Sequence, residues 1–181
     1  AVAEARKISK AMVYDLSDDA VKNFIAKMGE KLGIEIIKAG SPDEILEQAD
    51  IICAATSSPT PIFDGNKVRP GTHINGIGSH TPNARELDTA IIKRSMLVAD
   101  SYEACLNEAG DIMIPIDEGA IDKSHMKAEL GEIVTGKKPA RGDDNEITIF
   151  KSNGLAIQDA ATAKLVYDRA LAAGIGQSID I

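Results

Sequence analysis

Asp15 is a carboxylate in a position from which it could hold a nucleotide sugar. It follows the short apolar run at residues 11–14, and Ser17 after it is a good helix N-cap. In dinucleotide-binding sheets an acidic residue at the end of the second strand accepts hydrogen bonds from the ribose hydroxyls. The same pattern is also compatible with an ordinary strand-to-helix turn. Asp15 therefore predicts a nucleotide site only if the surrounding elements form such a sheet.

A second group of polar and small residues follows two further apolar runs. Thr56 and two serines come after the run at 51–54, and Gly76 and Gly78 end the run at 72–76. Side chains beyond the carboxyl ends of parallel strands lie where such sheets bind ligands, and glycine lets a flat ring approach the backbone. His80 comes next, with a side chain that can exchange protons near neutral pH. Alternatively, these residues form loops without a ligand site, and His80 is hydrogen-bonded only to backbone.

The intervening sequence alternates between apolar runs and helical patterns. Further strands are predicted at 34–37, 96–99 and 147–150, and helices at 18–32, 42–48, 86–94 and 154–173. We expect Arg85, Glu86 and Asp88 to form a solvated helix start, and the less regular stretch 111–145 to cover an edge of the sheet. Repeated strand–helix–strand units with short connections predict an α/β fold with a doubly wound parallel sheet.

The position of Asp15 also predicts what the chain lacks. The acidic residue follows the glycine-rich turn of a dinucleotide-binding domain by roughly 20 residues, and counting back from Asp15 passes the start of the chain. We therefore expect a Rossmann-like domain at 1–150 without its first strand and glycine loop. Residues 1–7 would then be the end of the first crossover helix.

Composition restricts the function classes. The net charge of −8 argues against non-specific binding to nucleic acid or to anionic membranes, and no apolar run approaches the length of a bilayer span. Cys53 lies in an apolar run, so we expect a buried, reduced thiol, and neither cysteine has metal-ligand spacing. His125, between two lysines, is expected to be exposed. These features predict a cytoplasmic protein that binds no metal.

Three segments resemble the ornithine cyclodeaminase/mu-crystallin family, in the same order along the chain. They are IICAATSS at 51–58, VRPGTHINGIGSHTP at 68–82 followed by RELD at 85–88, and TIFKSNGLAIQD at 148–159. The second segment is the most specific, because the first would fit many Rossmann proteins.

The resemblance implies an NAD(P)-binding domain joined to a separate substrate domain, usually in a dimer. It implies that residues 151–181 return toward that substrate and dimerisation domain. The cofactor-binding positions implied are Asp15, Thr56, Ile74, Asn75, Gly76, Ile77 and Ser152, and Asn153 is implied to bind substrate. An acidic Asp15 would repel a 2′-phosphate, which favours NAD over NADP.

His80 is the departure from the family pattern. In the cyclodeaminases and in an archaeal-type alanine dehydrogenase this place carries an Asp, which in the cyclodeaminase lies beside the substrate amine. A histidine cannot supply the same fixed negative charge. His80 is therefore our candidate catalytic residue in an NAD-dependent oxidoreductase acting on a small amino or imino acid, resembling alanine dehydrogenase or ketimine reductase. The alternatives are an ornithine cyclodeaminase that uses NAD catalytically and a crystallin-like NAD(P)H-binding protein without activity.

Overall fold

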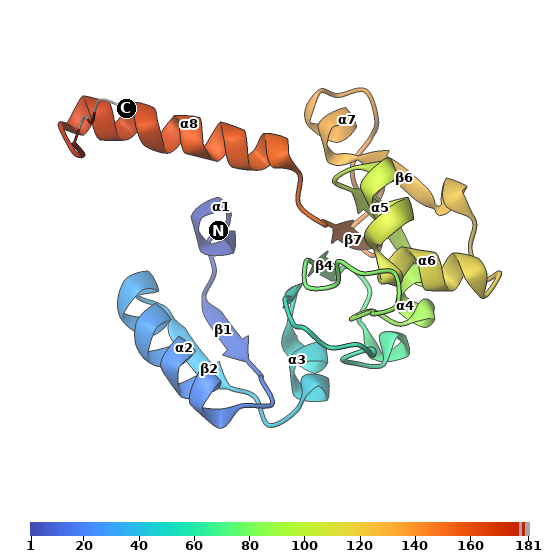
Figure 1. Cartoon of the computed structure of the whole chain (residues 1–181). Helices are drawn as coiled ribbons and strands as arrows, with labels where there is room; N and C mark the ends of the chain where they lie inside the picture. The colour runs from blue at the N-terminus through green and yellow to red at the C-terminus, as the bar shows by residue number, and fades with distance from the viewer. Residues whose placement is uncertain (178, 180–181) are drawn as a thin grey trace.

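The computed structural model describes residues 1–177 and 179 (Figure 1). The strands are β1 (Lys10–Val13), β2 (Glu35–Lys38), β3 (Ile51–Ala54), β4 (His73–Gly76), β5 (Ser95–Ala99), β6 (Met126–Glu129) and β7 (Ile147–Lys151). The α-helices are α1 (Val2–Ala5), α2 (Asp18–Leu32), α3 (Pro42–Gln48), α4 (Thr89–Arg94), α5 (Tyr102–Glu108), α6 (Gly110–Asp117), α7 (Leu130–Val134) and α8 (Ala156–Ala173). Two 3-10 turns, η1 (Gly65–Lys67) and η2 (Lys123–His125), complete the order.

All strand pairs are parallel, as the alternation of strands and helices predicted. They form a two-stranded sheet, β1-β2, and a five-stranded sheet in the order β3-β4-β7-β5-β6. Within the described residues, β1 pairs only with β2, and β3 pairs only with β4. The α/β fold with parallel strands is confirmed, and β1-β2 forms a sheet separate from the five-stranded one.

β7 is the last strand along the chain, as predicted, and it lies inside the sheet between β4 and β5. The stretch 111–145 does more than cover an edge, because it contributes most of α6, all of α7 and the edge strand β6. β6 is only four residues long, with buried Met126 and Ala128 on either side of an exposed lysine, and so short an alternation is easily missed in a sequence.

Local capping explains where the helices begin and end. The Ser17 hydroxyl accepts a hydrogen bond from the Ala20 amide at the start of α2, and Gly33 ends it with φ of 62°. α4 is shorter than the predicted helix at 86–94, because the Asp88 side chain caps it by accepting from the Ile91 amide. The residues before Asp88 therefore stay outside the helix.

The core lies on one face of the five-stranded sheet, under α3, α4, α5 and α6. Side chains from the strands, such as Ile74 and Ile149, pack there against Ile91 of α4 and Ile112 of α6, all fully buried. The opposite face is open over much of its area. Cys53 lies on that face and is exposed, so the predicted buried thiol is wrong, since no described helix covers this part of β3.

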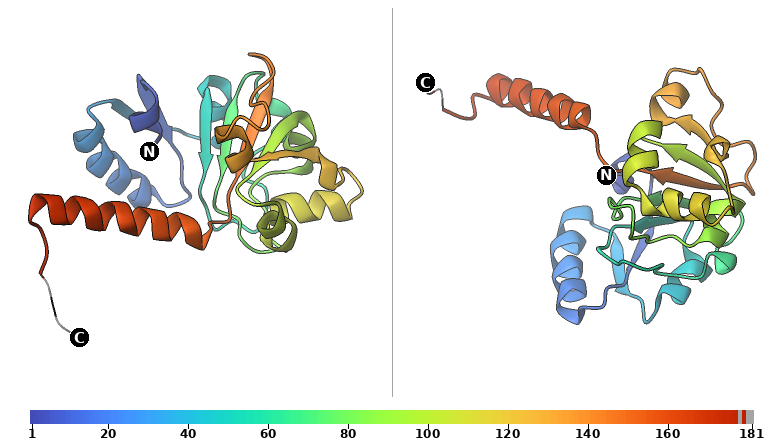
Figure 2. Two further views of the ribbon diagram at one scale, coloured as in Figure 1. Left: turned by 90° about the horizontal axis from the view of Figure 1, so that it is seen from above. Right: turned by 45° about the vertical axis from the view of Figure 1, so that its right-hand side comes forward.

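α8 runs away from the rest of the molecule (Figures 1 and 2). None of its residues is buried, and its exposed apolar side chains include Ile157, Leu165, Val166, Tyr167 and Leu171. The β1–α2–β2 unit also stands apart from the five-stranded sheet in these views. Within the described residues, no helix combines the length and apolarity needed to cross a bilayer.

Candidate functional site

The carboxyl ends of four neighbouring strands form one continuous edge. The hydrogen-bond ladder extends past the strands, because the amide of Ile77 donates to Ala54 O at 2.9 Å and that of Ser152 to Gly76 O at 3.1 Å. On the other side of β7, the Asp100 amide donates to Lys151 O at 3.0 Å. The loops after β3, β4, β7 and β5 are therefore adjacent, in the place where open parallel sheets bind ligands.

Thr56 and Ile77 present accessible groups at this edge. The Thr56 hydroxyl oxygen accepts from the Ser58 amide at 3.1 Å, which leaves its proton free to donate to a ligand. Half of the Ile77 side chain is exposed. Two other predicted cofactor-binding residues, both in β4, are not accessible at this edge. The Ile74 side chain is fully buried in the core, and the Asn75 side-chain amide contacts Cys53 on the open face. Gly76 has no side chain, so only its backbone could contact a ligand.

His80 lies in the loop after β4 with one ring nitrogen engaged. Its Nδ1 is 3.0 Å from Gly78 O, and the side chain is exposed. A carbonyl can only accept, so Nδ1 carries the proton in this contact and Nε2 of the neutral ring is left as an acceptor. The sequence predicted a residue able to exchange protons here, and the contact with Gly78 O favours the tautomer with the proton on Nδ1.

Asp100 holds the loop that contains Ser152 and Asn153. Its Oδ2 accepts from the Ser152 hydroxyl at 2.9 Å and from the amides of Asn153 and Gly154 at 2.8 and 2.9 Å. The Asn153 side chain turns inward and donates to Ala104 O at 3.2 Å. The Ser152 hydroxyl is thus already hydrogen-bonded within the protein. Ser152 and Asn153 present mainly backbone groups at the edge.

Asp15 lies outside this cluster. It follows β1 in the two-stranded sheet, and its Oδ1 accepts from the Ser17 amide at 2.8 Å. The side chain is exposed, which leaves carboxylate lone pairs available to the hydroxyls of a sugar. The structure therefore keeps Asp15 at the strand-to-helix turn expected for a ribose contact.

Several buried charged residues at the edge were missed from the sequence. Glu86 was expected in a solvated helix start, yet it is fully buried, as are Asp111 and Lys151. Burial raises the pKa of Asp111 above the ordinary carboxyl value, although Lys151 and the amides of Glu86 and Leu87 act in the opposite direction. The only signal in the sequence was the position of Glu86 and Lys151 inside the family-like segments.

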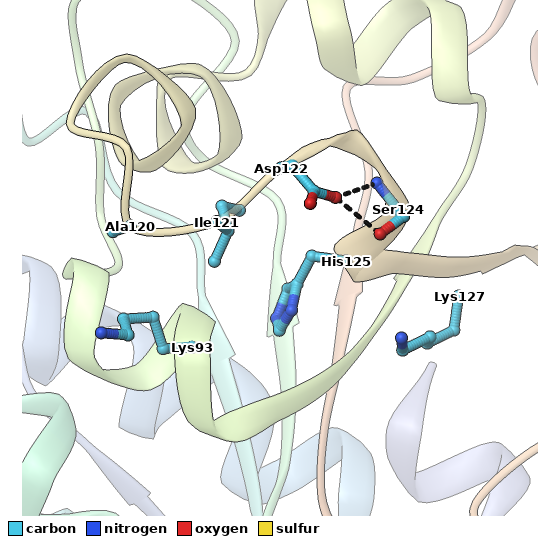
Figure 3. Close-up of a pocket in the computed structure, with 7 residues that line it drawn as sticks. All are labelled: Lys93, Ala120, Ile121, Asp122, Ser124, His125 and Lys127. Atoms are coloured by element: carbon cyan, nitrogen blue, oxygen red, sulfur yellow. Dashed lines mark hydrogen bonds between the residues drawn. The ribbon is translucent and has the colours of Figure 1, made fainter.

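A hollow lies away from this edge, near the amino ends of β5 and β6 (Figure 3). It has a volume of about 220 Å³ and is lined by Lys93, His125 and Lys127 among others. His125 was expected to be exposed, but it is half-buried, with Nε2 2.6 Å from Ile92 O. Its contacts are those of a structural histidine that joins η2 to α4.

A family model describes the sequence from residue 1 to residue 174, and it is the model of the ornithine cyclodeaminase/mu-crystallin family. The chain belongs to this family. The resemblance inferred from the three sequence segments is confirmed.

Related proteins include reductases and dehydrogenases named for imino and amino acids, and some related structures were solved with NADH or NAD bound. The structure of Delta(1)-pyrroline-2-carboxylate reductase from Thermococcus litoralis, in complex with NADH and L-proline, is 49% identical with a TM-score of 0.94, covering 98% of this chain and 55% of that one. A Delta(1)-pyrroline-2-carboxylate reductase of Bacillus cereus is 39% identical over 181 residues, 99% of this chain and 55% of the relative. The alanine dehydrogenase of Archaeoglobus fulgidus is 36% identical over 172 residues, 95% of this chain and 52% of the relative. The chain thus spans about half the length of the curated relatives that it matches.

Proposed function

We propose that the protein is an NAD-dependent reductase of small imino acids, with Delta(1)-pyrroline-2-carboxylate as the first substrate to test. The observation that carries the proposal is the shared edge after β3, β4 and β7, where Thr56, Ile77 and His80 lie together on adjacent loops. The similarity to a structure that contains NADH and L-proline supports the same assignment.

Asp15 and the residues at the edge would together hold the dinucleotide. Asp15 offers an exposed carboxylate for the ribose hydroxyls, and its negative charge disfavours a 2′-phosphate. Thr56 lies along the cofactor, and Ile77 with the backbone of Gly76 and Ser152 faces the nicotinamide. Ile74 supports this surface from the core, and Asn75 lies beside it on the open face. When bound, NADH supplies the hydride that is added to the carbon of the C=N bond.

His80 is the residue that donates the proton required by the reaction. Reduction of an imine forms one C–H and one N–H bond, so a proton must reach the nitrogen as the hydride reaches the carbon. The ring would donate from Nε2 in its doubly protonated form, because Nδ1–H stays bonded to Gly78 O, and water would then return a proton to Nε2. We place Asn153 on the substrate side of the same edge. The amino or imino acid would lie between these loops and a second domain, which residues 151–181 approach.

Spectrophotometric assay of NADH oxidation by the full-length protein tests this function. We expect turnover with Delta(1)-pyrroline-2-carboxylate, and a smaller rate with pyruvate and ammonia. Release of ammonia from ornithine without net NADH formation would identify a cyclodeaminase instead. Tight NADH binding without turnover of any of these substrates would support a binding protein.

Replacement of His80 by Ala is expected to reduce kcat by about 100-fold or more, since general acid–base catalysis contributes on the order of 10²–10⁴. NADH affinity, measured by fluorescence titration, should change little because the imidazole acts on the substrate. His125→Ala is the matched control and should leave kcat unchanged. A His80→Ala enzyme with the wild-type kcat would remove His80 from the catalytic assignment.

We further propose a cytoplasmic homodimer. The free state of Cys53 and Cys105 is typical of a reducing compartment. Two exposed apolar surfaces, α8 and the open sheet face, are available to the substrate and dimerisation domain that the family relationship implies.

A further inference from the structure

Three charged side chains lie fully buried beneath the proposed cofactor edge. Glu86, Asp111 and Lys151, here called the buried charge cluster, each have 0% exposure. Removing an ionised group from water costs several kcal/mol unless partners compensate. Apolar residues of similar volume are often as stabilising in such places, so stability alone does not account for three buried charges.

Glu86 joins two loops that come from different strands. Its Oε1 accepts from the amide of Thr56 after β3 at 2.5 Å, and its Oε2 accepts from the amide of Gly78 after β4 at 2.7 Å. The two loops pass so closely that a Cβ at position 78 would overlap Thr56 O. One carboxylate therefore sets the separation of the loops that carry Thr56 and His80.

Asp111 fixes the backbone of Glu86 by accepting hydrogen bonds from it. Its Oδ1 accepts from the backbone amides of Glu86 and Leu87 at 2.8 and 2.9 Å. The preceding Gly110 permits this approach, because a Cβ there would overlap the carbonyl of Ala84. The orientation of Glu86 thus depends on α6, which begins at Gly110.

Lys151 connects the cluster to β7 and to the histidine loop. Its Nζ is 3.4 Å from Asp111 Oδ2, and it donates to Ser79 O at 2.5 Å. It also reaches Gly76 O and Ser152 O, both at 3.3 Å. Ser79 immediately precedes His80, so the ammonium group fixes the backbone from which the imidazole projects.

We propose that the buried charge cluster positions His80 and Thr56 for hydride transfer at the carboxyl edge. This inference rests on the proposed function. Each member acts through another residue: Glu86 through the amides of two loops, Asp111 through Glu86, and Lys151 through Ser79. None of the three is exposed to a ligand, so they are positioning residues rather than catalytic ones.

The principal test is Glu86→Gln in the full-length protein. The amide keeps one oxygen acceptor and places an NH₂ group against the other loop amide, so one of the two loop contacts is lost. We expect kcat with Delta(1)-pyrroline-2-carboxylate to fall by about 10- to 100-fold, the loss typical of a displacement of about 1 Å at a reacting group. The affinity for NADH should fall by a smaller factor than kcat, because Thr56 is one cofactor contact among several and Asp15 is untouched.

Two readouts separate positioning from a general loss of stability. The deuterium isotope effect with 4-deuterated NADH should increase in Glu86→Gln, because hydride transfer becomes slower relative to the other steps. Hydrogen exchange at the amides of Thr56 and Gly78 should be slow in the wild type and faster in the variant. Glu118→Gln is the matched control, since it also removes one carboxylate charge but lies at the surface beside Arg85 and Thr89.

A second variant, Lys151→Met combined with Asp111→Asn, removes both charges of the buried Lys151–Asp111 ion pair and leaves the Glu86 carboxylate with its two loop amides. It should also lower kcat and speed exchange in the loop at 78–81. The inference is overturned if either variant retains the wild-type kcat, or if exchange at Thr56 and Gly78 is already fast in the wild type. A wild type that binds NADH but reduces no substrate would contradict the proposed function alone, and the exchange results would still decide whether the cluster holds the loops.

Discussion

At the scale of single residues, the edge depends on carboxylates that accept hydrogen bonds from backbone amides. Asp100 and Glu86 each hold loop amides, whereas Asp15 has one amide partner and stays exposed. Buried carboxylates with several donors are fixed in orientation, while an exposed one is free to bind a ligand. The difference separates the residues that shape the site from the one that we expect to touch the cofactor.

Asp15→Ser tests the cofactor contact. Loss of hydrogen bonds to a charged acceptor should raise the Kd for NADH by about 10- to 100-fold, since such bonds contribute about 1.5–3 kcal/mol. Discrimination against NADPH should shrink, because the charge that repels its 2′-phosphate is gone. Asp19→Ser removes a nearby exposed charge on α2 and serves as the control. Equal NADH affinity in all three proteins, measured by fluorescence titration, would exclude the ribose contact.

Cys105 is expected to make folding sensitive to alkaline pH. Burial raises the pKa of its thiol from 9.0 to about 12, and the neighbouring Asp100 acts in the same direction. Above the ordinary thiol pKa the unfolded chain loses a proton that the folded chain retains, so stability falls as pH rises from 9 toward 12.

Urea unfolding at about pH 7 and about pH 10 checks this sign. The decrease in unfolding free energy between the two values should be smaller in Cys105→Ala than in the wild type. The cavity left by the substitution lowers stability at both pH values, so only the difference between them is informative. Identical decreases would show that this thiol does not titrate differently on folding.

At the scale of elements, close contact between loops decides how the strand ends are arranged. Gly78 lies where the loops after β3 and β4 meet, and Gly110 lies where α6 meets the loop at 81–84. Both positions lack room for a side chain. Their role is therefore one of close packing, which is different from the turn conformation that glycines such as Gly33 provide.

Gly78→Ala should separate the loops and disturb His80. We expect a loss of about 1–3 kcal/mol in unfolding free energy, as for other overpacked sites, together with a lower kcat/KM. Gly29→Ala is the matched control in α2, where the added methyl meets nothing within 4 Å. That control should be stabilising by about 0.5–1 kcal/mol, because Ala is the better helix former. Thermal unfolding and NADH oxidation of both variants measure these effects.

At the scale of the whole molecule, two surfaces are unusually apolar for a folded chain. α8 buries none of its residues, and the open face of the five-stranded sheet presents a hollow of about 350 Å³ lined by residues such as Met96, Ile133 and Phe150. Parallel sheets are normally covered on both faces. We propose that these surfaces pack against the separate substrate domain that the family resemblance implies.

The rate at which the Cys53 thiol reacts with a reagent tests whether the open sheet face is covered. In the chain of residues 1–181 expressed alone, its exposed thiol should react readily with a chromogenic disulfide reagent. In the full-length protein the reaction should be slower, because further residues would cover the open face. Cys105 is buried and should stay unreactive in both until they unfold. Equal Cys53 rates in the two proteins would contradict the proposed cover.

Most of the elements could be predicted from the sequence, because periodicity and capping are local properties. Ser17 and Gly33 bound α2, and apolar runs locate β3, β4 and β5 with small shifts at their ends. The family-like segments also located the loops of the candidate site. The residue roles assigned there remain predictions, since they depend on ligands and on further parts of the protein.

Only the tertiary structure decided which distant residues meet. The insertion of β7 between β4 and β5 results from pairing across 75 residues in the case of His73 and Thr148, which no local pattern encodes. The burial of Glu86 and Lys151 has the same origin. The sequence does not distinguish a buried charged side chain from an exposed one. Such a side chain can lie in the core only where it finds polar partners, which here come from β4, α6 and β7.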